Sequence, residues 1–106
     1  MKMDMNKMLR QVQEMQEQMA KAQEELKNET VEASAGGGMV TVKATGGLEI
    51  VEIKISPDAI DPDDPDLLAD MVLAAVNEAL RSAQSLVESK LGSAMGGLQG
   101  LGLPGL

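Results

Sequence analysis

The first part of the chain carries an apolar residue at alternating steps of three and four. These residues are Met5, Met8, Val12, Met15, Met19, Ala22 and Leu26. The spacing is that of a heptad seam, and the intervening residues are mostly Gln, Glu, Lys and Arg, which favour helices. The pattern predicts one long helix over about residues 4–27. Its narrow apolar stripe is either core within the molecule or a surface shared with a partner, for which flexible Met side chains are suited.

After this helix the apolar period changes to two, which predicts three antiparallel strands over about 29–35, 39–45 and 48–55. The glycines at 36–38 and 46–47 supply the tight turns between them. A triple glycine that cradles phosphate leads into a helix, whereas this one leads into a strand, so we interpret it as a hairpin turn.

The third strand has an irregular phase. Leu48 and Ile50 share one face, while Val51, Ile53 and Ile55 share the other. Either a bulge re-aims the strand, or both of its faces are covered, one by a helix and one by a second subunit.

The segment 56–66 is rich in Asp and Pro, and it precedes a second run of helical periodicity. Its carboxylates do not follow the spacing of a calcium loop. They fit a helix start, with Asp63 or Asp64 as N-cap and Pro65 in the first turn. The second helix is expected over about 65–90, with a broad Ala-rich face and Gly92 as the residue after its end.

These elements predict an α+β fold: a long N-terminal helix, a three-stranded antiparallel sheet and a long C-terminal helix. Residues 1–91 would form a single domain, and 92–106 a disordered Gly/Leu tail.

Composition narrows the function. The chain has no Phe, Tyr or Trp, so its core has little apolar area, and we expect at least a dimer. It has no Cys and no His, which excludes disulfides, the usual zinc sites and both thiol and imidazole catalysis. We therefore predict no enzyme, no catalytic residue, no cofactor, no metal and no small-molecule substrate. The charged N-terminus does not fit a signal peptide and no run could span a membrane, so a cytoplasmic protein is expected.

The net charge of −8 is unevenly distributed. Residues 1–28 carry five basic and five acidic groups, whereas residues 29–66 carry two basic and nine acidic groups, a balance of −7. A helix of this length is roughly 36 Å long and the longest strand about 26 Å, so the helix must extend beyond the sheet. Its projecting end carries Lys2, Lys7 and Arg10, and Arg81 and Lys90 lie towards the far end of the second helix.

The whole layout resembles the YbaB/EbfC family of bacterial nucleoid-associated proteins. The resemblance is carried by Asn6-Lys7-Met8, Gln13-Glu14-Met15-Gln16, Val31-Glu32-Ala33-Ser34-Ala35-Gly36-Gly37-Gly38-Met39-Val40-Thr41-Val42, Ile53-Lys54-Ile55-Ser56-Pro57, Leu73-Ala74-Ala75-Val76-Asn77-Glu78-Ala79 and Leu103-Pro104-Gly105-Leu106. It implies a small homodimer in the nucleoid, with tweezer-like projecting helices that bind double-stranded DNA with little sequence preference. The family's DNA contacts are attributed to its helices. The resemblance therefore implies that the basic residues of the two helices contact DNA, namely Lys2, Lys7, Arg10, Lys21, Arg81 and Lys90.

Two alternatives stand beside this interpretation. The basic residues fit ordinary surface charge, since Lys21 lies within pairing distance of Glu17 and Glu24 along a helix. The Met-rich seam fits a protein-interaction scaffold, in which it would form an adaptable groove or pair with another helix.

Overall fold

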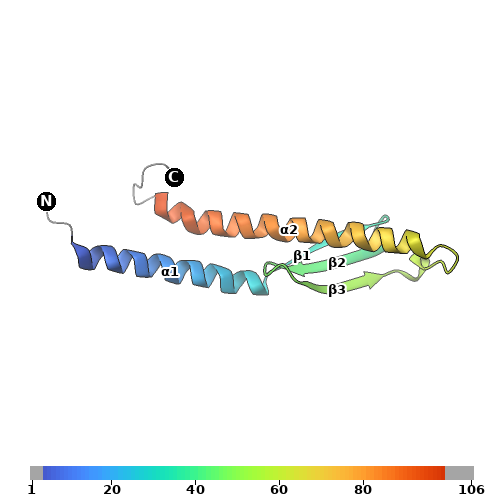
Figure 1. The fold of residues 1–106 in the computed structure, drawn as a ribbon, viewed down its shortest axis with the longest axis horizontal. Coiled ribbons are helices and arrows are strands. Elements are labelled where there is room, and N and C mark those ends of the chain that lie inside the picture. The colour runs from blue at the N-terminus through green and yellow to red at the C-terminus, as the bar shows by residue number, and fades with distance from the viewer. Residues whose placement is uncertain (1–3, 100–106) are drawn as a thin grey trace.

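The chain forms an elongated α+β molecule of 77 × 23 × 16 Å (Figure 1). The computed structural model describes residues 4–99, with side chains as far as Ser93. The elements follow the predicted order, with helix α1 at Met5–Asn28, strands β1 at Thr30–Ala35, β2 at Val40–Thr45 and β3 at Ile50–Ile55, a 3-10 turn η1 at Pro57–Ala59, and helix α2 at Pro65–Gln99. The strands form one antiparallel sheet in the order β1-β2-β3, which confirms the predicted fold class.

Both helices begin at carboxylate caps. The Asp4 Oδ1 accepts hydrogen bonds from the backbone N–H groups of Asn6 and Lys7, at 3.1 and 3.3 Å. The Asp64 Oδ1 accepts one from the N–H of Leu67 at 3.3 Å, which makes Asp64 the N-cap directly before Pro65, as expected. These caps accept hydrogen bonds from backbone N–H groups that have no partner within the helix. They also place negative charge at the N-terminal end of the helix, where the helix dipole is positive.

α2 continues beyond its predicted end. It runs past Lys90 and through Gly92 as far as Gln99. A single glycine within a helix costs only about 1 kcal/mol, so Gly92 is a poor stop signal without a following Pro or a strong cap. The predicted helix end was therefore too early, and the part of the predicted tail from residue 100 lies outside the described residues.

The core is a contact between β2 and an alanine stripe of α2. Val40, Val42 and Ala44 of β2 are fully buried, together with three alanines of α2, which are Ala75, Ala79 and Ala83. Alanine lets the helix backbone approach the strand closely. Val40 and Val42 are the largest fully buried side chains, so the core is as small as the absence of aromatic residues predicted.

A β-bulge explains the irregular phase of β3. Lys43 pairs with Glu52, and Ala44 pairs with Ile50, so Val51 is an extra residue at this point. The bulge returns Ile53 and Ile55 to the face of β2 that carries the buried Val42 and Val40. The bulge, one of the two explanations left open by the sequence, is present.

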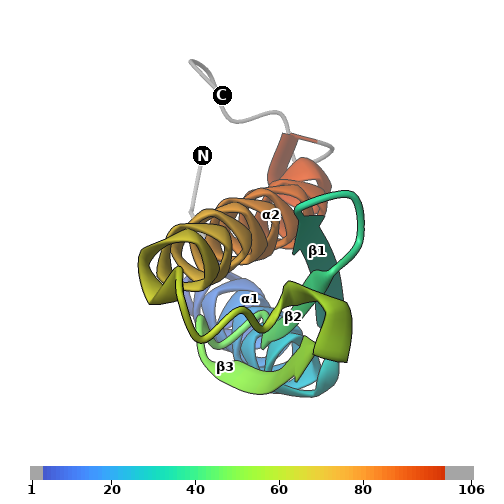
Figure 2. The ribbon, with the colours of Figure 1, turned by 90° about the vertical axis from the view of Figure 1, so that its right-hand side faces the viewer.

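The sheet is only partly covered by α2. This helix packs mainly on β1 and β2 and has little contact with β3, as the view along the molecule shows (Figure 2). Ile53 and Ile55 therefore remain 45% and 39% exposed although they lie on the core side of the sheet. We call Ile50, Ile53 and Ile55 the open face of β3.

α1 does not lie over the sheet. It continues the long axis of the molecule beyond the sheet, alongside the C-terminal half of α2 (Figure 1). Ala22 and Leu26 are buried, Met15 and Met19 are half-buried, and Met5 is 70% exposed. The seam is thus core at its C-terminal end and exposed at its N-terminal end, where sharing with a partner stays a prediction.

The end of α1 meets the sheet at a glycine. The backbone N–H of Gly46 donates a hydrogen bond to the carbonyl of Glu29 at 3.0 Å. A Cβ added at Gly46 would lie 2.5 Å from the carbonyl oxygen of Leu26 and 2.9 Å from its Cβ. Only a residue without a side chain allows the turn between β2 and β3 to approach α1 this closely.

We predict that Gly46→Ala destabilises the protein by about 1–3 kcal/mol, because the added methyl group forces the turn away from α1. Denaturant unfolding would measure this loss. Gly47→Ala is the control, since its added Cβ would meet its nearest atom, the Thr45 Oγ1, at 3.4 Å. Equal stability losses in the two variants would contradict the close contact at Gly46.

Candidate nucleic-acid interface

The exposed half of α1 carries two of the predicted DNA-binding cations. Lys7 and Arg10 are three residues apart, so they lie on one side of the helix, and both are exposed. Helical spacing directs them away from the seam formed by Met8 and Val12. Neither cation takes part in an ion pair within the part of the chain that the structure describes. Lys2 lies outside the described residues.

The remaining predicted cations on α1 and α2 have different surroundings. Lys21 lines a cleft between the helices, and it pairs with neither Glu17 nor Glu24 among the described residues, although the sequence favoured such pairs. Arg81 donates to the Oε2 of Glu78 through Nε and Nη2, at 3.1 and 2.8 Å. Because Arg81 lies between alanines that pack on β2, it is beside the sheet and far from the exposed half of α1.

Lys90 bridges the two helices. Its Nζ lies 2.8 Å from an oxygen of Glu25 and 3.3 Å from the Oε1 of Glu29, both at the C-terminal end of α1. The Lys90 side chain is only 29% exposed. The other carboxylate oxygen of Glu29, Oε2, is buried and has no hydrogen-bond partner in the described part of the chain. The structure therefore brings Lys90 to carboxylates and not to Lys7 and Arg10.

This bridge shifts the protonation of both partners. The hydrogen bond from Lys90 and its positive charge hold the pKa of Glu25 below its ordinary value of 4.5. Hydrogen bonds to Glu25 and Glu29 raise the pKa of Lys90 above its ordinary value of 10.5. The pair thus stays ionised over the whole range between these two values.

A pH dependence follows from the direction of the shifts. Since the pKa of Glu25 is lowered by folding, its stabilising effect is present above pH 4.5 and is lost as the pH falls through the lowered value. We expect Glu25→Gln to lower the unfolding temperature at about pH 7, and the difference from wild type to shrink at about pH 3. Thermal unfolding followed by circular dichroism would measure both. A difference in unfolding temperature that is independent of pH would contradict a stabilising ion pair between Glu25 and Lys90.

Charge is separated along the molecule. The Asp-rich loop between β3 and α2 lies at one end of the long axis, and the N-terminal end of α1 lies at the other (Figure 1). The long axis is 77 Å, whereas the screening length at about 0.1 M salt is roughly 10 Å. The net charge of −8 therefore does not set the potential around Lys7 and Arg10.

On α1, the sequence analysis named only cations as DNA-binding candidates. The exposed half of this helix also carries glutamines, at Gln11, Gln13 and Gln16. Side-chain amides donate hydrogen bonds to phosphate oxygens and therefore belong among the candidate DNA-contacting groups. Their density in the first turns of a helix was the signal available in the sequence.

Comparison with known proteins gives a consistent picture. Residues 1–98 match the YbaB/EbfC DNA-binding family. A nucleoid-associated protein of Acetivibrio thermocellus is 53% identical over 103 residues, which cover 97% of this chain and 89% of that protein. One from Pelotomaculum thermopropionicum is 52% identical, covering 97% of this chain and 95% of that protein.

Among solved structures, an uncharacterized protein from Helicobacter pylori has a similar fold. Its crystal structure matches with a TM-score of 0.72 at 21% sequence identity, covering 89% of this chain and 98% of that chain.

In the described part of this chain, neither helix has an apolar stretch long enough to cross a membrane.

Proposed function

We propose that this chain, which belongs to the YbaB/EbfC DNA-binding family, binds double-stranded DNA through the projecting α1 ends of a homodimer. The family is a DNA-binding family and not an enzyme family, and the chain's relatives are nucleoid-associated proteins. By this proposal the protein acts on the nucleoid. The family match does not favour the scaffold alternative.

The observation that carries this proposal is the exposure of Lys7 and Arg10 on a helix that projects beyond the sheet. Both cations lack carboxylate partners among residues 4–93, so a phosphate would not have to displace one. The acidic loop stands at the opposite end of the long axis, where it repels DNA from the sheet and not from α1.

Little sequence preference follows from the chemistry of this surface. Lys, Arg and Gln contacts to phosphate position a protein on the duplex without reading its sequence. The chain has no aromatic side chain to stack on an unpaired base. We therefore expect affinity to depend on salt more than on base composition.

The open face of β3 supports the homodimer. Large apolar side chains on the core side of a sheet are ordinarily covered, yet Ile53 and Ile55 are exposed in a single chain. A second copy that packs here would extend a core that contains no aromatic residue. It would also place two α1 ends on one particle, so that both can engage the same duplex.

A salt series on a random-sequence duplex tests the proposal. Fluorescence anisotropy of the labelled duplex would give the dissociation constant at each salt concentration. We expect affinity to fall with salt, with a logarithmic slope of about −0.9 for each phosphate contact. A second duplex of different base composition should bind with similar affinity. Absence of binding even at low salt would refute the proposed function.

A further inference from the structure

One basic and two acidic groups at the base of α1 form an ion-pair cluster that joins the two helices. Lys90 of α2 contacts Glu25 and Glu29 of α1 at 2.8 and 3.3 Å, and we call these three residues the clasp. The other described ion pairs lie within one helix or on the sheet. The clasp therefore stands alone among them in connecting α1 to α2.

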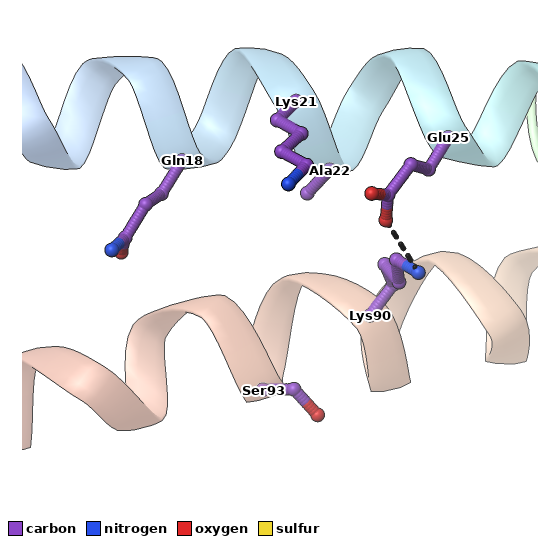
Figure 3. Close-up of a pocket in the computed structure, with 6 residues that line it drawn as sticks. All are labelled: Gln18, Lys21, Ala22, Glu25, Lys90 and Ser93. Atoms are coloured by element: carbon purple, nitrogen blue, oxygen red, sulfur yellow. Dashed lines mark ion pairs between the residues drawn. The ribbon is translucent and has the colours of Figure 1, made fainter.

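The helices are separated beyond the clasp. A cleft of about 440 Å³ lies between them, lined by Gln18, Lys21, Ala22, Glu25, Lys90 and Ser93. Figure 3 shows Gln18, Glu25 and Lys90 between the two ribbons, with the Glu25–Lys90 pair at the end of the cleft nearer the sheet. Past the cleft, the residues of α1 from Asp4 to Glu14 are all exposed. Besides the clasp, α1 is held by the buried Ala22 and Leu26 and by the half-buried Met15 and Met19.

The clasp acts where α1 joins the rest of the fold. Glu29 follows the last residue of α1, and its carbonyl accepts the hydrogen bond from Gly46 in the turn between β2 and β3. Its side chain reaches Lys90. One residue thus connects α1, the sheet and α2, so a small change of angle at this point moves the far end of α1 by a large distance.

From this geometry we infer that Lys90 is a positioning residue: it sets the direction of α1, and with it the placement of Lys7 and Arg10, and does not itself contact DNA. This inference rests on the proposed function. A surface that is already held in its binding arrangement loses less conformational entropy on association. Loss of the clasp would weaken DNA binding without removing any contact to phosphate.

The decisive variant keeps Lys90 and removes its partners. Glu25→Gln/Glu29→Gln takes two negative charges from each chain and leaves the Lys90 ammonium unpaired. If Lys90 contacted phosphate, this variant would bind the random duplex more tightly and with a steeper salt slope. We expect the opposite, an affinity about three- to tenfold lower than wild type with an unchanged slope. Tighter binding would overturn the inference.

Lys90→Met and Arg81→Met form a matched pair, since each removes one positive charge from α2. Arg81 pairs only with Glu78 of its own helix among the described residues, so its loss leaves the clasp intact. We expect Lys90→Met to weaken binding by about three- to tenfold at constant slope, and Arg81→Met to stay near wild type. A slope that becomes shallower by about 0.9 in Lys90→Met would make Lys90 a phosphate contact and refute the inference.

The direction of α1 can be measured without DNA. The chain has no cysteine, so spin labels at Gln11→Cys on α1 and Gln84→Cys on α2 are specific. With labelled chains diluted in excess unlabelled protein, pulsed electron paramagnetic resonance reports the distance within one chain. We expect a broader distance distribution in Glu25→Gln/Glu29→Gln and in Lys90→Met than in wild type or Arg81→Met.

This measurement separates the possible failures. If the clasp variants only lose stability, their unfolding temperature falls while the distance distribution of the folded protein stays that of wild type. An unchanged distance distribution would refute the positioning role of Lys90. A wild type that binds no duplex would refute the proposed function, while the distance distributions would still decide whether the clasp directs α1.

Discussion

Charge reversal on the projecting end of α1, in Lys7→Glu/Arg10→Glu, is expected to lower affinity for a random duplex by about sixtyfold for each α1 end that is engaged, at about 0.1 M salt. Each phosphate contact contributes about 0.9 decade of affinity at this salt concentration, and two contacts are lost from each engaged chain. Repulsion between the new carboxylates and DNA adds to this loss. The salt slope should become shallower by about 0.9 for each contact removed.

The control for this variant carries the same change of net charge elsewhere. Lys27→Glu/Lys54→Glu replaces two exposed lysines, one at the sheet end of α1 and one on β3. Neither lies on the projecting half of α1, so we expect a much smaller loss of affinity and an unchanged slope. Equal losses in the two double variants would show that net charge alone governs binding. DNA would then not be located at Lys7 and Arg10.

The elements of this fold could be predicted because their signals are local. A step of three and four predicted α1, alternation predicted the strands, and Asp64 with Pro65 predicted the start of α2. The phase change in β3 was consistent with a bulge, and the pairing of Ala44 with Ile50 established that the bulge is present.

What the sequence did not predict depends on contacts between distant segments. The ion pair of Lys90 with Glu29 joins residues 61 positions apart along the chain, which no periodic pattern connects. The sequence predicted that one end of α1 projects beyond the sheet, but not that the whole helix lies beyond it, joined to the sheet where Gly46 closely approaches Leu26. Local patterns specify which helix carries the cations, and tertiary contacts decide which cations remain available.

The oligomeric state links the fold to the proposed function. A single α1 end presents few cations, and a particle with two ends gains affinity because the second contact is intramolecular. The open face of β3 is the apolar surface that a second copy would cover, and its residues are not among those that would contact DNA. Dimerisation and DNA contact can therefore be disrupted separately.

Introducing a charge on the open face of β3, in Ile53→Asp, is expected to convert the proposed dimer into a monomer. Burying an unpaired carboxylate costs several kcal/mol, and the substitution occurs on both copies of a symmetric interface. A loss of about 3 kcal/mol weakens the dimer more than a hundredfold. In the isolated chain Ile53 is 45% exposed, so the carboxylate stays hydrated and the monomer should remain folded. Sedimentation equilibrium would measure the mass, and circular dichroism the helix content.

Ser34→Asp adds the same charge at an exposed position of β1 and should leave the dimer intact. Ile55→Asp, on the same face as Ile53, should reproduce the monomer. The monomeric variants should also bind duplex DNA about a hundredfold more weakly than wild type, because each particle then carries a single α1 end. A wild type that sediments as a monomer would contradict the proposed homodimer. An Ile53→Asp variant that dimerises like wild type would instead show that the open face of β3 is not part of the dimer interface. The exposed Met5–Val12 part of the seam would then be the next candidate for that interface.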